Sequence, residues 1–133
     1  NEGLYLGNGG RATLDSYGIL LSDDLEERKA KIPEEHMNFF RLLLPYYETD
    51  HYIFVHAGVR PELPLNRQAI DDLLWIRFEF IENENDFGKT VVFGHTPMKN
   101  LLINKNKIGI DTGAVYGGKL TAIELPDIRI YQA

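Results

Sequence analysis

Two apolar segments in the middle of the chain each end on a histidine. The first runs from Tyr52 to Val55 and is followed by His56, and the second runs from Thr90 to Phe93 and leads to His95. Uncharged runs of aliphatic and aromatic residues are typical of strands buried on both faces of a sheet. A glycine lies beside each histidine, and we expect it to let the backbone turn sharply where the strand leaves the sheet.

The amino-terminal third has the hydrophobic and polar spacing of helices. The turn at Asn8-Gly9-Gly10 is expected to precede a short helix over 11–17, and Ser22-Asp23-Asp24 to cap a helix through Lys29. From Pro33, apolar residues recur at spacings of three and four through Tyr47, which predicts a helix with one apolar stripe. We expect this stripe to be part of the core.

The carboxy-terminal part predicts further strands. Residues 68–75 favour a short helix, and strands are expected at Lys107–Asp111 and Leu120–Leu125. Turn glycines between these last two strands predict that they form a hairpin. Four strands, early helices and short connections indicate an α/β fold with a mixed sheet.

Composition limits the classes of function. A chain of 133 residues suits one domain, and a net charge of -6 argues against general affinity for nucleic acid. No apolar stretch is long enough to span a membrane, and no signal peptide is evident. The absence of cysteine excludes thiolate metal sites and favours the cytoplasm.

The two strand-end histidines are the first candidates for chemistry. The carboxyl ends of strands in an open α/β sheet form the ligand crevice, so His56 and His95 could bind zinc, manganese or iron there. The alternative is a hydrogen-bonded structural role for each. His36 and His51 are expected to be surface residues.

Arg77 is the second candidate, because apolar residues surround it in the sequence. Its planar guanidinium suits two-point binding of a phosphate or carboxylate, and an internal salt bridge to Asp71, Asp72 or Glu79 is the alternative. Arg60 is expected to be a solvated loop cation that could reach a substrate, and Tyr116 could contact one. Asp111 favours a structural turn.

Taken in order, five segments resemble the phosphoprotein-phosphatase branch of the calcineurin-like metallophosphoesterases, particularly its bacterial and phage members. The matching segments are Asn8-Gly9-Gly10, Phe54-Val55-His56-Ala57-Gly58, Leu74-Trp75-Ile76-Arg77, Phe93-Gly94-His95-Thr96-Pro97 and Ile110-Asp111-Thr112-Gly113-Ala114. Each is weak alone, but the series is specific and covers nearly all of the chain.

The resemblance implies a four-layer α/β/β/α sandwich with mixed sheets, of which residues 1–133 would be the carboxy-terminal part of one domain. It also implies two divalent metal ions, manganese before iron, zinc or magnesium, with His56 and His95 binding the second ion and Arg77 binding phosphate oxygens. Pro97 stands where many diesterases of the superfamily have a second histidine, which favours phosphomonoesters. Metal-activated water would attack the phosphorus directly.

The amino-terminal motifs of that family, Gly-Asp-x-His-Gly, Gly-Asp-x-x-Asp-Arg-Gly and Gly-Asn-His-Glu, are not in this sequence. The chain therefore carries half of such a site, and its partner could be the missing amino-terminal half or a second copy. The leading hypothesis is a cytoplasmic serine/threonine phosphoprotein phosphatase. The alternatives are a dinucleoside tetraphosphatase of the same superfamily and a non-catalytic assembly module.

Overall fold

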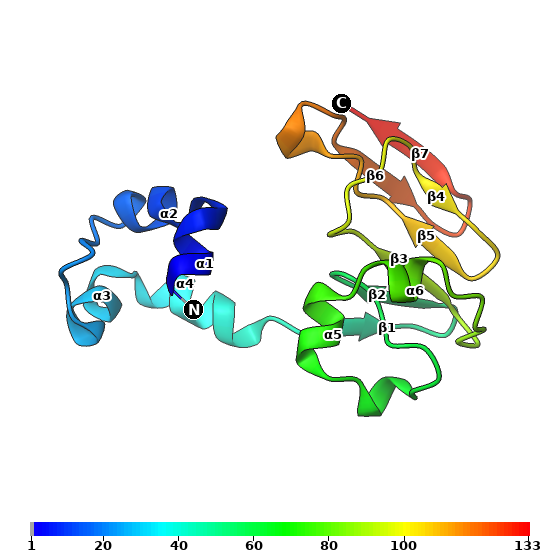
Figure 1. The fold of residues 1–133 in the computed structure, drawn as a ribbon, viewed down its shortest axis with the longest axis horizontal. Coiled ribbons are helices and arrows are strands. Elements are labelled where there is room, and N and C mark those ends of the chain that lie inside the picture. Colours follow the sequence, from blue (N-terminus) through cyan, green and yellow to red (C-terminus); the bar gives the residue numbers. More distant parts are fainter. Residues whose placement is uncertain (1) are drawn as a thin grey trace. The chain divides into compact units, whose positions relative to one another are not determined.

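The computed structural model describes residues 2–133, which form two compact units that meet in the chain between Leu43 and Leu44 (Figure 1). That both units belong to one domain stays a prediction. In the described part of the chain, no helix is both long and apolar enough to cross a membrane.

The first unit is helical. Its elements are α1 (Glu2–Tyr5), the π-helical turn η1 (Leu6–Gly10), α2 (Arg11–Ser16), α3 (Leu25–Lys31) and α4 (Glu34–Leu42). The predicted break falls inside η1, where Asn8 and Gly9 leave helical geometry and Gly9 takes a φ of 88°. The predicted cap is also confirmed, because the Asp24 carboxylate accepts hydrogen bonds from the backbone N–H groups of Glu26 and Glu27 in a capping box.

The apolar stripe of α4 differs from the prediction. Three residues of the stripe, Phe40, Leu43 and Leu44, are exposed, so within the described residues this stripe is not core. The helix also ends at Leu42, because Pro45 and the following residues extend into strand β1 (Tyr46–Glu48) rather than continuing the helix to Tyr47. Tyr46 and Tyr47 suit a strand as well as the end of an apolar helix stripe, and the sequence pattern did not distinguish the two.

The second unit is built on a five-stranded mixed sheet with the order β1-β2-β3-β5-β4. Strands β2 (Tyr52–Val55), β3 (Thr90–Phe93) and β5 (Lys107–Gly109) are parallel neighbours, and β1 and β4 (Leu102–Ile103) are antiparallel at the two edges. The apolar runs that predicted β2 and β3 are therefore confirmed as central strands. Their carboxyl ends, together with that of β5, lie at one edge of the sheet.

The prediction that the strands at Lys107–Asp111 and Leu120–Leu125 form a hairpin is wrong. Strand β6 (Thr121–Glu124) pairs with β7 (Arg129–Gln132) in a separate two-stranded sheet, whereas β5 pairs with β3 and β4. The short helix η3 (Ala114–Tyr116) stands between β5 and β6, flanked by left-handed Gly113 and Gly117. Strand β7 is exposed throughout and carries no continuous apolar run, so the hydrophobic pattern did not predict it.

Two short helices pack on the sheet and form the core of this unit. They are α5 (Ile70–Trp75) and α6 (Phe78–Ile81), and a third, η2 (Leu65–Arg67), lies in the loop before them. Phe80 of α6 is fully buried, and an added Cβ on Gly58 would collide with its ring. Gly58 is therefore needed for the close approach of α6 to the segment after β2. The buried cluster is Ile53, Val55, Ala57, Val59, Leu73, Ile76, Phe80, Val91 and Phe93.

Lys107 at the start of β5 is a buried cation, with 1% of its surface exposed. Its ammonium donates a hydrogen bond to the carbonyl of Asn83 and lies 5.0 Å from the centre of the Phe80 ring. Burial lowers the pKa of Lys107, and the nearby Glu84 carboxylate only partly offsets this effect.

The Lys107 shift predicts a pH-dependent stability. A lowered folded-state pKa means that the unfolded chain binds the proton more tightly, so stability rises with pH just below the ordinary lysine value of 10.5. We expect Lys107→Met to lose this rise, so that the stability of the variant relative to the wild type falls as the pH increases. Urea unfolding at several pH values would measure the difference, and parallel pH profiles for the two proteins would contradict it.

Candidate active site

His56 and His95 come together at the carboxyl ends of β2 and β3. The two strands pair in parallel with Phe54 opposite Val92, and the Gly94 N–H donates a 2.9 Å hydrogen bond to the His56 carbonyl. Nε2 of His56 then lies 3.0 Å from Nδ1 of His95, with the ring centres 4.8 Å apart. The predicted juxtaposition is therefore present in the structure, and the metal-binding roles of the two side chains stay predictions.

The backbone that presents His95 is strained. His95 has a φ of 64°, in the left-handed region that non-glycine residues rarely adopt. Gly94 does not take a positive φ, so the expectation that this glycine makes the turn is wrong. The Thr96 N–H donates to the Gly94 carbonyl at 2.7 Å and closes a tight turn around His95. Strain of this kind persists where the surroundings hold a side chain in one position, which is common at functional sites.

The far nitrogen of the His95 ring is buried without a partner. Its Nε2 makes no hydrogen bond within residues 2–133, and the Trp75 ring lies edge-on to the imidazole with the centres 5.5 Å apart. Burial lowers the pKa of His95, and the positive charges of His56 and Arg77 lower it further, whereas Asp111 opposes them. These effects favour the neutral imidazole, which is the form that binds a metal ion.

A buried, unpartnered imidazole nitrogen fits a metal ligand, but the set of ligands is small. Within residues 2–133, no group of three or more histidine, aspartate or glutamate side chains is arranged to hold a metal ion. Stable divalent sites in proteins usually have three or four protein ligands. His56 and His95 thus fit part of a metal centre, and the remaining ligands would have to come from other residues.

Arg77 lies between α5 and α6 and is exposed. Its side chain makes no ion pair or hydrogen bond with any residue that the structure describes. The alternative, an internal salt bridge, is absent in the described residues, where two of the three candidate partners, Asp72 and Glu79, bind Arg60 instead. The guanidinium of Arg77 is therefore available to bind an anion.

Arg60 is not the solvated cation that the sequence predicts. Its Nε donates to Asp72 at 2.8 Å, and Nη1 lies 3.1 Å from a Glu79 carboxylate oxygen. The hydrogen bonds and charge of Asp72 raise the pKa of Arg60, and the pairing lowers the pKa of Asp72. Substrate binding by Arg60 stays a prediction, and it would require breaking or sharing these contacts.

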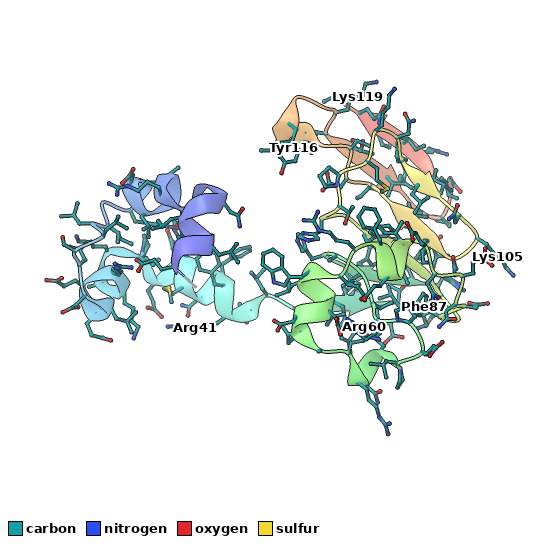
Figure 2. The ribbon with its side chains drawn as sticks, viewed as in Figure 1. Arg41, Arg60, Phe87, Lys105, Tyr116 and Lys119 are labelled. Carbon is teal, nitrogen blue, oxygen red and sulfur yellow. The ribbon has the colours of Figure 1, made fainter. Side chains whose placement is uncertain are left out.

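Tyr116 and Asp111 come from the segment after β5. Tyr116 is 79% exposed, and Figure 2 shows it far from Arg60 at the other end of this unit, so the structure does not gather these two predicted substrate contacts. The Asp111 carboxylate accepts a 3.0 Å hydrogen bond from the Gly113 N–H, which confirms the predicted turn. The expected surface positions of His36 and His51 are confirmed as well.

Sequence reasoning missed Trp75 as a member of the site. It is the single tryptophan of the chain and lies two residues before Arg77, which is the signal that could have identified it. Trp75, Arg77 and Phe78 line an open cavity of 450 Å³, and the Trp75 ring also contacts His95.

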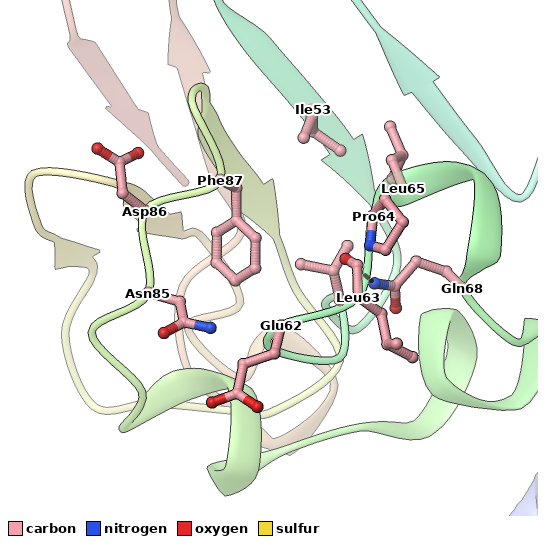
Figure 3. Close-up of a pocket in the computed structure, with 10 residues that line it drawn as sticks. Ile53, Glu62, Leu63, Pro64, Leu65, Gln68, Asn85, Asp86 and Phe87 are labelled. Atoms are coloured by element: carbon pink, nitrogen blue, oxygen red, sulfur yellow. Dashed lines mark hydrogen bonds between the residues drawn. The ribbon is translucent and has the colours of Figure 1, made fainter.

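A second cavity, of 390 Å³, is lined by none of the candidate site residues. Phe87 and Ile53 face it, and Gln68 holds its rim by donating a 2.9 Å hydrogen bond to the Leu63 carbonyl (Figure 3). Gln68 also bonds the backbone of Arg60 in both directions, so it fixes the loop that follows β2. We assign this cavity no part in the chemistry.

Comparisons with known proteins find relatives that are named as phosphatases. No family model matches the chain. It is 53% identical to bis(5'-nucleosyl)-tetraphosphatase PrpE [asymmetrical] of Geobacillus sp. (strain WCH70), over 92% of this chain and 55% of that protein. It is 50% identical to the protein of the same name from Bacillus cereus (strain ATCC 10987 / NRS 248), over 58% of this chain and 37% of the relative. The chain thus spans about half the length of the Geobacillus relative.

A solved structure shares the fold. A crystal structure assigned provisionally as a diadenosine tetraphosphatase matches with a TM-score of 0.66 and 24% identity, over 82% of this chain and 60% of that one. The chain accordingly shares a mixed α/β fold with that structure, and the predicted α/β class with a mixed sheet is confirmed.

Proposed function

We propose that the protein containing this sequence is a metal-dependent phosphoesterase that hydrolyses dinucleoside tetraphosphates. The observation that carries the proposal is the pair of imidazoles of His56 and His95. Nε2 of His95 is buried without a partner in the described residues, and the unpaired Arg77 is close enough to lower the pKa of His95. The names of the relatives support a tetraphosphate substrate over the phosphoprotein substrate that the sequence first suggested. No contact in the described residues favours a phosphopeptide.

In this proposal His56 and His95 hold one metal ion through their imidazole nitrogens. Bound divalent ions lower the pKa of a water and neutralise charge on the phosphoryl oxygens. The burial of His95 lowers its pKa and so favours the neutral imidazole, and the Trp75 ring packs edge-on against it. Manganese as the metal and the cytoplasm as the location stay predictions.

Arg77 supplies the positive charge of this chain toward the phosphate. Its guanidinium has no carboxylate partner, because Asp72 and Glu79 pair with Arg60 instead. A planar donor with free N–H groups can bind two phosphoryl oxygens at once and stabilise the charge that develops on them. The Arg60 ion pairs thereby keep Arg77 free for the substrate.

The test is a substrate comparison with the full-length protein and added manganese. Diadenosine tetraphosphate should be hydrolysed faster than a phosphoserine peptide. Attack of one water at an outer phosphate releases AMP and ATP, as the word asymmetrical in the relatives' name leads us to expect, whereas central cleavage would release two molecules of ADP. Faster turnover of the phosphopeptide would overturn the proposal, and chelation should abolish either activity.

Replacing Arg77 by alanine should chiefly weaken phosphate binding and transition-state stabilisation. Loss of one charged donor of this kind raises the activation free energy that corresponds to kcat/KM by about 2–4 kcal/mol. Arg77→Lys should recover only part of it, because an ammonium cannot offer the bidentate fork. Arg67→Ala, which changes an exposed arginine in η2, is the matched control. Equal activities of Arg77→Ala and the control would remove Arg77 from the mechanism.

A further inference from the structure

The 450 Å³ cavity lined by Trp75 and Arg77 combines two exposed aromatic rings with one unpaired arginine and the ion pairs of Arg60. Trp75 is 52% exposed and Phe78 is 60% exposed, and both line the same 450 Å³ cavity as Arg77. Trp75 ends α5, and Phe78 begins α6 three residues later. Exposed aromatic rings on either side of an arginine, one of them in contact with His95, are typical of a surface that binds a ligand.

The charges around the cavity favour one kind of ligand. Arg77 attracts an anion, while Asp72 and Glu79 are already bound by Arg60 and do not compete for it. Asp71, which also lines the cavity, is exposed and makes no ion pair or side-chain hydrogen bond in the described part of the chain. A ligand with a flat ring, an anionic group and hydrogen-bond donors would therefore meet a matching group in each part of this cavity.

We propose that this cavity is the subsite for one nucleoside of the substrate, with the base against Trp75 and Phe78 and the adjoining phosphate on Arg77. The proposal rests on the proposed function and adds which residues recognise the base. Base stacking on aromatic rings is tolerant of base identity, because every base presents a π-face. The Asp71 carboxylate can accept from a ribose hydroxyl or an exocyclic amino group. The centres of the Trp75 and His95 rings are 5.5 Å apart, so a base stacked on Trp75 would lie near the proposed metal ligands.

Trp75 is itself the reporter for a binding experiment, since this chain has a single tryptophan. AMP should quench its fluorescence saturably, whereas ribose 5-phosphate, which has the sugar and the phosphate but no base, should not. Phe78→Leu should weaken AMP binding about tenfold, and Tyr131→Leu, at an exposed aromatic position of β7, should leave it unchanged. Equal effects of the two ligands, or no quenching by AMP, would overturn the proposal.

Kinetics of the full-length protein separate a base contact from mere support of His95. Trp75→Leu should lower kcat/KM for diadenosine tetraphosphate about tenfold more than for inorganic tripolyphosphate, which has no base. Trp75→Phe keeps a flat ring and should retain most of that selectivity. An equal loss on both substrates would mean that Trp75 only positions His95. If AMP quenches but no tetraphosphate is hydrolysed, the proposed function fails while the base subsite stands.

Discussion

Replacing His95 by asparagine in the full-length protein is expected to lower phosphoesterase activity at least about a thousandfold. The buried Nε2 that has no protein partner would be lost, and the shorter amide cannot place a nitrogen at the same point. His56→Asn should have a comparable effect, because its ring contacts His95 at 3.0 Å and lies at the same sheet edge. Both variants should also bind manganese more weakly, which electron paramagnetic resonance of free manganese would measure directly.

His36→Asn is the matched control for these variants. His36 lies in α4 and its Nδ1 is 2.9 Å from the Tyr17 hydroxyl, so it is a surface imidazole with an ordinary partner. Its activity and manganese affinity should equal those of the wild type. If His95→Asn retained wild-type turnover, the ligand assignment would be wrong, whatever the metal affinity. A loss of turnover with unchanged manganese binding would instead give His95 a role apart from the metal.

The two histidines could be found from the sequence because the signal for them is local. An uncharged run that ends at a histidine and a glycine indicates a buried strand and its exit, and two such runs indicate two neighbouring strand ends. The strain at His95 could not be found in this way. Its φ of 64° depends on the hydrogen bonds and packing that the folded chain places around the turn, and Gly94 beside it is the residue that sequence reasoning would choose.

The errors concern interactions between distant positions. Arg60 and Arg77 are both loop arginines in the sequence, and only the packing of α5 and α6 decides that Arg60 takes Asp72 and Glu79 while Arg77 stays free. Pairing of β6 with β7, in place of the expected pairing with β5, is likewise decided by which edges meet in space. The spacing in α4 correctly predicts an amphipathic helix, but spacing alone does not say what covers an apolar face.

Replacing Phe80 by alanine should cost the chain about 3–5 kcal/mol of unfolding free energy. The side chain is fully buried, and its ring lies 5.0 Å from that of Phe93 in an edge-to-face contact. The Lys107 ammonium would also lose the aromatic face that it now lies over. Domains of this size are commonly stable by about 5–15 kcal/mol, so this one change would remove a large share. Urea unfolding followed by circular dichroism would measure the loss.

Phe78→Ala is the matched control, because it deletes the same side chain two positions away in the same short helix. Phe78 is 60% exposed, so little packing is lost and the stability should change by no more than about 1 kcal/mol. The comparison also bears on the site. The Phe80 ring packs against Gly58, where no larger residue fits, and Gly58 lies two residues after His56. A cavity in place of the Phe80 ring would therefore loosen the segment that carries this histidine. Phe80→Ala should therefore weaken manganese binding even under conditions where the variant stays folded. Equal stabilities of the two alanine variants would show that α6 does not pack on the sheet as described.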